Sequence, residues 1–307
     1  MAATDFKCEL SWSASRAREF ARCKRENWYA RYGSWGWWTE RPAGEKVQFA
    51  ILKNLSSLPA FAGTCMHEAI ERWFELKRGG TAMTADELYE DARERFRAGW
   101  RQSAGQEWMR RPSKVVHLEE HQYGVDMPAE RLGAVNELLQ RCARYFCESR
   151  ELAPVRDSLP EDWLSVEALD SYMFLGAKVY AVPDFAARVG EEIHIWDWKT
   201  GKPREADEFQ LNTYALYACE RWSADPEAIV LHAAYLGAGE VRSKPVDIDK
   251  LSTVQDRMSE SVREMLDLHY DPDQDEVVMA NWPTSGAPQA CPGCRFRAVC
   301  EEGSPLT

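Results

Sequence analysis

The 307-residue sequence lacks any apolar run long enough to span a membrane. A transmembrane helix needs about 18 or more consecutive apolar residues, and no stretch of this chain approaches that length. Residues 1–20 also lack the apolar segment that a secretory signal requires. The G-x-x-x-x-G-K-[ST] pattern of a P-loop is missing as well, which excludes a recognisable nucleotide-hydrolysing motif. We therefore expect a cytoplasmic protein that makes no membrane contact.

An excess of positive charge is missing too. The chain has 38 Lys and Arg against 50 Asp and Glu, a formal net charge of −12. A surface of this charge does not coat nucleic acid indiscriminately. Residues 16–31 and 93–114 are nevertheless basic, whereas residues 247–278 are acidic. Each basic stretch is expected either to line a channel for a phosphate backbone or to form a solvated helix face.

Cysteine is not scarce, since the chain contains nine. Without an export signal, a disulfide framework is not expected. Cys291, Cys294 and Cys300 crowd into a short C-terminal stretch, and a fourth ligand from far away in the sequence would complete a metal site. Cys23 is well placed for that role. Four thiolates suit either an iron-sulfur cluster or structural zinc, and the remaining alternative is no metal.

The first half of the chain is predicted to be mostly helical. Apolar residues repeat at helical spacing in residues 16–32, 62–78, 84–101 and 128–149, with a break over 33–59. From Leu164 the pattern alternates and favours strands. Residues 164–170, 177–189 and 192–199 are expected to form three consecutive antiparallel strands. A helix over 206–222, strands at 228–235 and after Gly239, a helix over 248–269 and a loop-like tail after Pro272 follow.

Two acidic residues in the predicted strands carry the strongest chemical signal. Val182-Pro183-Asp184 and Asp197-Trp198-Lys199 flank a turn, so a hairpin brings Asp184 alongside Asp197. Side chains alternate along a strand, which directs Asp197 and Lys199 to one face and Trp198 to the other. Two carboxylates with a backbone carbonyl and waters suit Mg²⁺. The alternative is an exposed Asp/Lys pair on an edge strand.

Neighbouring residues extend this candidate site. Lys199 can orient a metal-bound water and offset negative charge as an oxygen attacks a phosphodiester. Glu167, on the preceding strand, is placed to reach the same cation directly or through water. Gln210 and Tyr214 lie one helical turn apart and can face one edge of the site. Taken alone, each of these residues is equally typical of a protein surface that has no function in catalysis or binding.

The order of these residues resembles the nuclease domain of the RecB-like branch of the PD-(D/E)XK superfamily. The matching elements are Glu167, Asp184, Asp197-x-Lys199-Thr200-Gly201, Gln210-x-x-x-Tyr214, Leu10-Ser11-x-Ser13-x-Ser15 and Gly63-Thr64-x-x-His67-x-x-x-Glu71. The resemblance spans Leu10 to Cys300. It implies an α/β restriction-endonuclease-like core, a mixed sheet flanked by helices. It also implies that Mg²⁺ or Mn²⁺ is held by His67, Asp184, Asp197 and the Trp198 carbonyl.

The cysteines resemble a subset of this branch that carries an iron-sulfur cluster. That subset includes AddB-type recombination nucleases and CRISPR-associated RecB-like exonucleases, with one cysteine before the core and three after it. The resemblance implies a [4Fe-4S] cluster, with zinc as the alternative, that clasps the N-terminal helix to the C-terminal tail. Lys24 replaces the usual proline after the first cysteine, and Val182 replaces a usual glycine, which bears on substrate fit.

The resemblance implies a metal-dependent deoxyribonuclease, an exonuclease that acts on DNA ends or single strands in recombination, repair or defence. The alternative is a non-catalytic DNA-binding or assembly subunit of a recombination or CRISPR-type complex. A zinc-stabilised metabolic hydrolase has only the cysteines in its favour. Because no P-loop is present, a helicase partner would supply any unwinding. The aromatic run from Trp28 to Trp38 is expected either to stack on bases or to pack internally.

We expect one domain over residues 1–307. It would comprise N-terminal helices with Cys23 and His67 over 1–83, a helical insertion over 84–160, the catalytic sheet and helix over 161–246, and a C-terminal helix with the cysteine cluster over 247–307.

Overall fold

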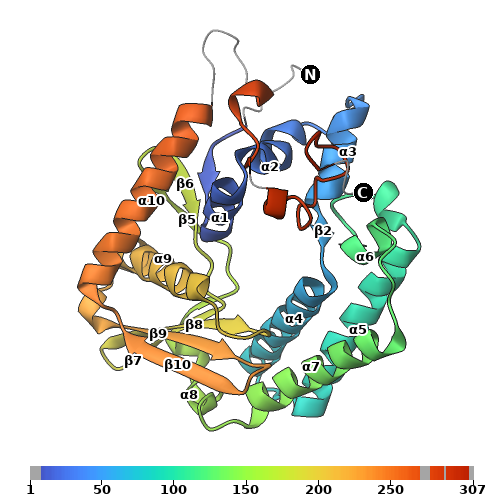
Figure 1. Cartoon of the computed structure of the whole chain (residues 1–307). Coiled ribbons are helices and arrows are strands. Elements are labelled where there is room, and N and C mark those ends of the chain that lie inside the picture. Colours follow the sequence, from blue (N-terminus) through green and yellow to red (C-terminus); the bar gives the residue numbers. More distant parts are fainter. Residues whose placement is uncertain (1–7, 270–276, 287, 304–307) are drawn as a thin grey trace.

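A computed structural model describes residues 8–269, 277–286 and 288–303 (Figure 1). Parts of the expected N-terminal segment 1–83 and C-terminal segment 247–307 lie outside these residues, as does the beginning of the loop-like tail after Pro272. Within the described ranges, no helix has both the length and the apolar character needed to cross a membrane.

The centre of the molecule is a five-stranded mixed sheet with strand order β10-β9-β8-β7-β4. Its strands are β4 (Trp163–Val166), β7 (Phe185–Val189), β8 (Glu192–Lys199), β9 (Ile229–Tyr235) and β10 (Glu240–Pro245). The pairs β4–β7 and β7–β8 are antiparallel, β8–β9 is parallel and β9–β10 is antiparallel. The antiparallel run that ends at β8 therefore places the ends of β4, β7 and β8 side by side.

Both faces of this sheet are buried, as the alternation in β8 requires. Trp196 and Trp198 belong to one hydrophobic core, and Ile193 and Ile195 belong to a second core on the opposite face. Successive side chains of a strand point to opposite faces, so a strand buried on both sides carries apolar residues at nearly every position. The predicted placement of Trp198 on its own face is confirmed.

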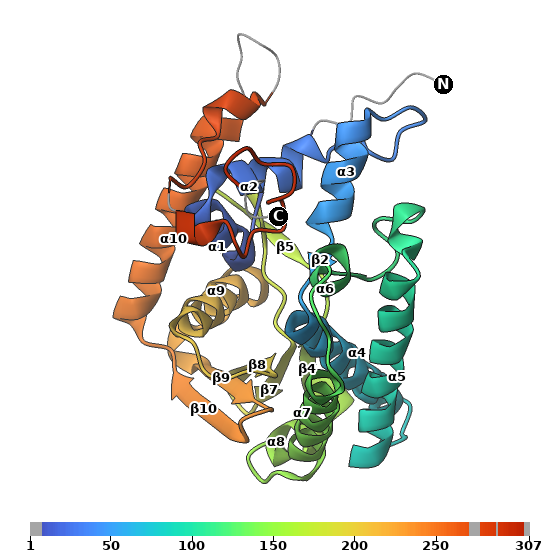
Figure 2. The same ribbon diagram turned by 45° about the vertical axis from the view of Figure 1, so that its right-hand side comes forward.

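Helices cover the two faces. On the Trp198 face lie α4 (Leu58–Arg78), α5 (Ala85–Ala104) and α7 (Ala129–Glu148). On the other face lie α9 (Glu205–Trp222) and α10 (Ile248–His269). Figures 1 and 2 show α4, α5 and α7 together on one side and α10 on the far side beyond α9. The arrangement is a mixed sheet between helical layers, consistent with the expected fold class.

A second, smaller sheet corrects one prediction. Residues 177–189 were expected to form a single strand, but β6 (Ala177–Tyr180) pairs with β1 (Ser11–Trp12) and β5 (Ser171–Phe174), whereas β7 belongs to the central sheet. The strand is interrupted over residues 181–184 around Pro183, which has no N–H to donate to a ladder. The expected strand 164–170 likewise ends at Val166.

The expected helix over residues 16–32 is also interrupted. It is divided into α1 (Ala14–Arg22), α2 (Lys24–Trp28) and a π-helical turn (Tyr29–Gly33), because Cys23 adopts an extended backbone with φ −161°. The region 33–59 was expected to be irregular but contains α3 (Gly44–Lys53). The remaining elements are β2 (Leu55–Ser56), β3 (His117–Leu118), α6 (Glu119–Gln122), α8 (Ala153–Asp157) and five short 3₁₀ turns at 107–109, 160–162, 226–228, 279–281 and 288–290.

The C-terminal tail packs against the N-terminal helices. The Trp28 indole donates to the Val277 carbonyl at 2.9 Å, and the Arg25 Nε donates to the Trp282 carbonyl at 2.7 Å. Phe296 is completely buried in a small core formed with residues of the π turn and α3. In both views the described part of the tail lies beside α2 (Figures 1 and 2). Direct protein contacts therefore join segments near the two ends of the chain.

Candidate metal centre and nucleic-acid cleft

Three potential ligands converge where α4 meets the ends of β4 and β7. His67 Nδ1 on α4 lies 3.1 Å from Glu167 Oε1 and 3.3 Å from Asp184 Oδ1. The ligand atoms of the three residues all lie within 4.8 Å of one another. The other imidazole nitrogen, His67 Nε2, lies 3.0 Å from the Trp198 carbonyl oxygen. The imidazole thus contacts the two carboxylates through Nδ1 and the Trp198 carbonyl through Nε2, on different sides of the ring.

The backbone holds the two carboxylates in place. Glu167 follows β4 directly with φ +45°, a left-handed conformation that is costly for a residue other than glycine. Its N–H donates to the Asp184 carbonyl at 3.1 Å. Asp184 in turn accepts a hydrogen bond on Oδ2 from the Trp198 N–H. Backbone strain of this kind concentrates at functional sites, where the surrounding structure over-determines it.

Asp197 and Lys199 lie beside this group on β8. The Asp197 carboxylate is only 1% exposed, and its Oδ2 lies 2.7 Å from Lys199 Nζ. Lys199 also donates to Gln210 Oε1 at 3.1 Å, and Gln210 Nε2 donates to the Tyr214 hydroxyl at 2.6 Å. Asp197, Lys199, Gln210 and Tyr214 therefore form one continuous polar chain from β8 to α9. This chain fixes the ammonium in position.

Burial and neighbouring charge shift the protonation of the site. Burial and the charge of Asp184 raise the pKa of Asp197 to about 7, although Lys199 opposes the shift. Burial lowers the pKa of His67, but Asp184 and Glu167 outweigh it and hold that pKa well above 6.5. Burial also raises the pKa of Glu167. The site thus retains protons near neutral pH that a bound cation would displace.

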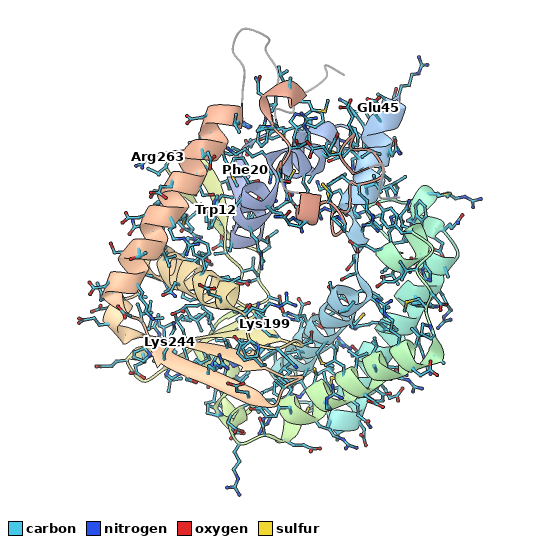
Figure 3. All side chains as sticks on the ribbon, in the orientation of Figure 1. Trp12, Phe20, Glu45, Lys199, Lys244 and Arg263 are labelled. Carbon is cyan, nitrogen blue, oxygen red and sulfur yellow. The ribbon has the colours of Figure 1, made fainter. Side chains whose placement is uncertain are left out.

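His67, Glu167 and Lys199 line a cleft of about 720 Å³ between α4 and α9, whereas Asp184 and Asp197 are buried behind them and do not line it. Figure 3 places Lys199 between these two helices. Basic residues from three parts of the chain line the cleft: Arg18 from α1, Lys199 from β8, and Lys202 and Arg204 from the loop before α9. Glu68, Glu71, Glu167 and Asp207 line the cleft as well, so its charge is mixed. The basic residues offer local contacts for a phosphate backbone.

Several polar residues of the cleft were not anticipated from the sequence, among them Ser57, Glu68 and Asp207. Asp207 on α9 lines the cleft, accepts from the Tyr235 hydroxyl at 3.1 Å and caps α9 through the Arg204 N–H at 2.9 Å. It lies three residues before Gln210, so the helical spacing on α9 could have identified it. Tyr235 lies on the strand next to β8, and no sequence pattern linked the two.

The basic stretches are used differently from one another. In the stretch 16–31, Arg18 lines the cleft, whereas Arg22 pairs with Glu26. In the stretch 93–114, no residue lines the cleft, and Arg93 and Arg95 pair with acidic side chains of the same helix.

The aromatic run from Trp28 to Trp38 contains both buried and exposed residues. Trp28, Tyr29 and Tyr32 pack internally, whereas Trp38 is 53% exposed.

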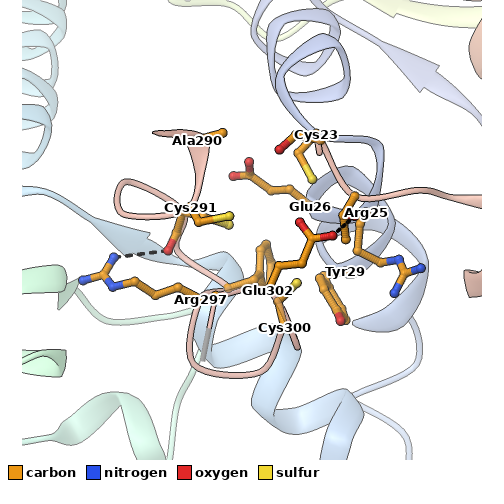
Figure 4. Close-up of a pocket in the computed structure, with 14 residues that line it drawn as sticks. Cys23, Arg25, Glu26, Tyr29, Ala290, Cys291, Arg297, Cys300 and Glu302 are labelled. Atoms are coloured by element: carbon orange, nitrogen blue, oxygen red, sulfur yellow. Dashed lines mark hydrogen bonds between the residues drawn. The ribbon is translucent and has the colours of Figure 1, made fainter. Parts of the chain in front are cut away.

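A second candidate metal site involves the cysteines. Cys23 lies between α1 and α2, and Cys291, Cys294 and Cys300 lie in the tail, yet all four line one pocket. Figure 4 shows the side chains of Cys23, Cys291 and Cys300 directed toward one another. Burial raises the pKa of Cys294 to about 12, so this thiol is neutral unless a metal replaces its proton. The fold therefore brings the expected four thiols into one place.

Comparison with known proteins supports the chemistry of the first site. The family model of the PD-(D/E)XK nuclease superfamily matches residues 11–301, a range that contains every residue of the metal centre, the cleft and the cysteine pocket except Glu302 and Gly303. No curated protein matches the chain. Proteins described by this family model are generally nucleases that use Mg²⁺ or Mn²⁺.

Proposed function

The chain belongs to the PD-(D/E)XK nuclease superfamily, and we propose that it is a deoxyribonuclease of the RecB-like branch, an exonuclease that acts on DNA ends or single strands. The convergence of His67, Glu167 and Asp184 beside the Asp197–Lys199 pair carries this proposal. The donor set of one imidazole and carboxylate oxygens suits a hard divalent cation.

We propose that His67, Asp184 and Glu167 hold the cation, since their ligand atoms all lie within 4.8 Å of one another. Asp197 and the Trp198 carbonyl, which the sequence also predicts as ligands, lie beside this group, with Asp197 paired to Lys199. Mg²⁺ or Mn²⁺ held there would supply Lewis acidity and a nucleophilic water for phosphodiester hydrolysis. His67 and Glu167 are in contact, so Glu167 also fixes the orientation of the imidazole.

Lys199 is assigned to stabilise negative charge at the phosphorus. Burial lowers the pKa of this ammonium, but Asp197 outweighs burial and raises it, so Lys199 stays protonated. A fixed positive charge in a partly dry site stabilises a charged transition state more strongly than one in water does. Gln210 holds Lys199 through its amide oxygen, and Tyr214 holds Gln210. Gln210 and Tyr214 are thus assigned as positioning residues.

We further propose that Cys23, Cys291, Cys294 and Cys300 bind a [4Fe-4S] cluster rather than zinc. The preference for the cluster rests on the resemblance to cluster-bearing relatives, and it is supported by four thiols that line one pocket, the ligand number that a [4Fe-4S] cluster takes. The cluster would act as a clasp between the N-terminal helices and the tail, remote from hydrolysis.

The DNA partner is proposed from the superfamily and is supported by Arg18, Lys202 and Arg204, which line the cleft beside the proposed metal centre. Because the sequence has no P-loop, any unwinding of duplex DNA would come from a helicase partner. We therefore propose that the chain acts in a recombination, repair or defence complex, including CRISPR-type complexes, in which it cleaves DNA and a partner unwinds it.

The test is degradation of end-labelled linear single-stranded, linear double-stranded and circular DNA with Mg²⁺ or Mn²⁺. Asp184→Asn, Asp197→Asn and Lys199→Met are each expected to reduce cleavage by about 100-fold or more. Asp256→Asn, an exposed acidic position on α10, serves as the control and is expected to keep wild-type activity. Resistance of circular DNA would identify an exonuclease.

Equal cleavage by the wild type and all three site variants would exclude this site. DNA binding by the wild-type protein without turnover under either metal would instead identify the non-catalytic DNA-binding or assembly subunit.

A further inference from the structure

A second basic pocket shares no lining residue with the cleft and has no part in the proposed metal chemistry. It has a volume of about 110 Å³ and lies where α1, the π turn and the end of α3 meet near α10. Arg16, Arg31 and Lys53 line it together with the uncharged polar side chains of Ser11 and Asn27. Three cations from three separate elements thus face one small space.

These cations are poorly neutralised. Arg31 Nε is buried without a hydrogen-bond partner, and Arg31 Nη2 lies 4.0 Å from Glu19 Oε1. Glu19 also accepts from Asn27 and pairs with Arg295, so its charge is shared. Lys53 Nζ forms no hydrogen bond or ion pair with any described residue.

The direct contacts of the Arg16 guanidinium are with uncharged groups, although the charge of Glu19 also acts on it. The guanidinium donates to Ser11 Oγ and lies 5.3 Å from the centroid of the Tyr180 ring. Glu9 also lines the pocket, but its side chain is exposed. No buried carboxylate lines the pocket in the part of the chain that the structure describes.

Holding the cations together is unfavourable without an anion. Burial and the neighbouring charges of Arg31 and Arg16 lower the pKa of Lys53 to about 8. Burial and Arg16 lower the pKa of Arg31 to about 10, although Glu19 opposes the shift. Buried like charges that perturb one another in this way are characteristic of binding sites, because a ligand of opposite charge relieves the repulsion.

We propose that the pocket lined by Arg16, Arg31 and Lys53 binds a phosphate group. Guanidinium groups match the paired oxygens of a phosphate, and an ammonium adds a point charge. The hydroxyl of Ser11 and the amide of Asn27 offer further polar contacts. The phosphate is carried by a nucleic-acid strand or is free inorganic phosphate, and both sources present the same tetrahedral oxyanion.

Arg16 lies on α1, as does Arg18 of the cleft, but side chains two residues apart on a helix point in different directions. The pocket and the cleft share no lining residue. A strand that reaches both would therefore contact the pocket with a phosphate away from the bond being cut. This assignment to a strand rests on the proposed nuclease function.

The first experiment uses inorganic phosphate and needs no cleavage. Thermal unfolding of the full chain is measured in phosphate and in chloride of equal ionic strength. At a hundredfold excess over Kd, phosphate is expected to raise the Tm of the wild type by about 5 °C more than chloride does. This difference is expected to disappear in Lys53→Met and in Arg31→Gln. Lys46→Met, an exposed lysine on the same helix, should retain it.

The second experiment measures binding of single-stranded DNA without added divalent cation, so that cleavage does not interfere. Strands of one sequence carry a 5′-phosphate, a 3′-phosphate or hydroxyl ends. Lys53→Met is expected to bind about tenfold more weakly than Lys46→Met. The slope of log Kobs against log[salt] should also decrease in magnitude by about 0.7, because Lys53→Met neutralises one phosphate fewer. If Lys53→Met weakens the binding of only one of the end-phosphorylated strands, the pocket binds that terminal phosphate. If Lys53→Met weakens the binding of all strands equally, the pocket binds an internal phosphate.

Equal Tm shifts and equal DNA affinities in Lys53→Met and Lys46→Met would overturn the proposal. A phosphate-specific Tm shift without any DNA effect would reject the strand and retain free phosphate as the ligand. Absence of nuclease activity together with that shift would reject the proposed function and leave the pocket assignment intact.

Discussion

At the scale of single residues, the metal centre depends on protons that must leave it. His67 and Asp197 both have pKa values raised above their ordinary values in the absence of a cation. A ligand must be deprotonated to bind a metal, so protons compete with the cation at both residues. Because both pKa values are raised, protons still occupy the imidazole and the carboxyl near neutral pH. Raising the pH removes these protons, so the cation affinity should increase with pH.

We accordingly expect the affinity for Mn²⁺ to increase with pH between about pH 6 and pH 8. The expected increase is about tenfold per pH unit for every proton that is released on binding. Calorimetry in buffers of different ionisation enthalpy measures both the Kd and the number of protons. Asp197→Asn should release fewer protons than the wild type, whereas Asp256→Asn should release the same number. An affinity that does not change with pH would contradict the assigned ligands.

At the scale of elements, α4 serves both the site and the core. Its buried residues, among them Cys65, Ile70, Trp73 and Phe74, pack against the sheet and the neighbouring helices, while His67 faces the cleft. The position of His67 thus depends on how closely α4 is held by its neighbours. Gly99 on α5 provides one such close approach, because a methyl group there would overlap the Phe61 ring and lie 2.7 Å from Val116 Cγ2.

Two glycine substitutions test this packing. Gly99→Ala is expected to lower the free energy of unfolding by about 1–3 kcal/mol, because the added methyl group overpacks the contact between α4 and α5. Gly133→Ala on α7 is the matched control, since a Cβ there meets no atom within 4 Å. It should raise the free energy of unfolding by about 1 kcal/mol through helix propensity alone. Denaturant unfolding curves measure both, and equal effects would exclude the close approach.

At the scale of the whole molecule, the ends of the chain share one structural region. The tail packs on α2 and the π turn through Trp28, Arg25 and Phe296, and the four cysteines lie in the same region. A group bound to Cys23 and to the tail cysteines would close a loop of most of the chain. Closing so long a loop restricts the unfolded state and stabilises the fold, because the group binds only the folded arrangement.

Cys300→Ala is therefore expected to lower the iron content and visible absorption of anaerobically purified protein and to reduce its Tm by about 10 °C. Cys219→Ala is the control, because Cys219 lies on α9 and packs against a different core. It should keep both the iron and the spectrum. Stoichiometric zinc without iron in the wild type would reject the cluster in favour of a zinc clasp.

The sequence by itself determined the local features of this protein. The alternation in residues 192–199 correctly predicted that Trp198 faces away from Asp197 and Lys199, and helical spacing predicted that Gln210 and Tyr214 lie on one face. These features follow from the period of a strand or a helix and involve residues only a few positions apart. Family membership, matched over residues 11–301, follows from the same order of residues.

Only the tertiary structure decided which distant segments meet. His67 and Glu167 are 100 residues apart in the sequence yet in contact, and Arg18 joins a cleft otherwise built mainly from α4, β8 and α9. The division of residues 177–189 between two sheets also depends on which strands pair, since β6 joins β1 and β5 whereas β7 joins the central sheet. Local periodicity fixes the direction of a side chain relative to its own element, whereas the packing of whole elements fixes what that side chain touches.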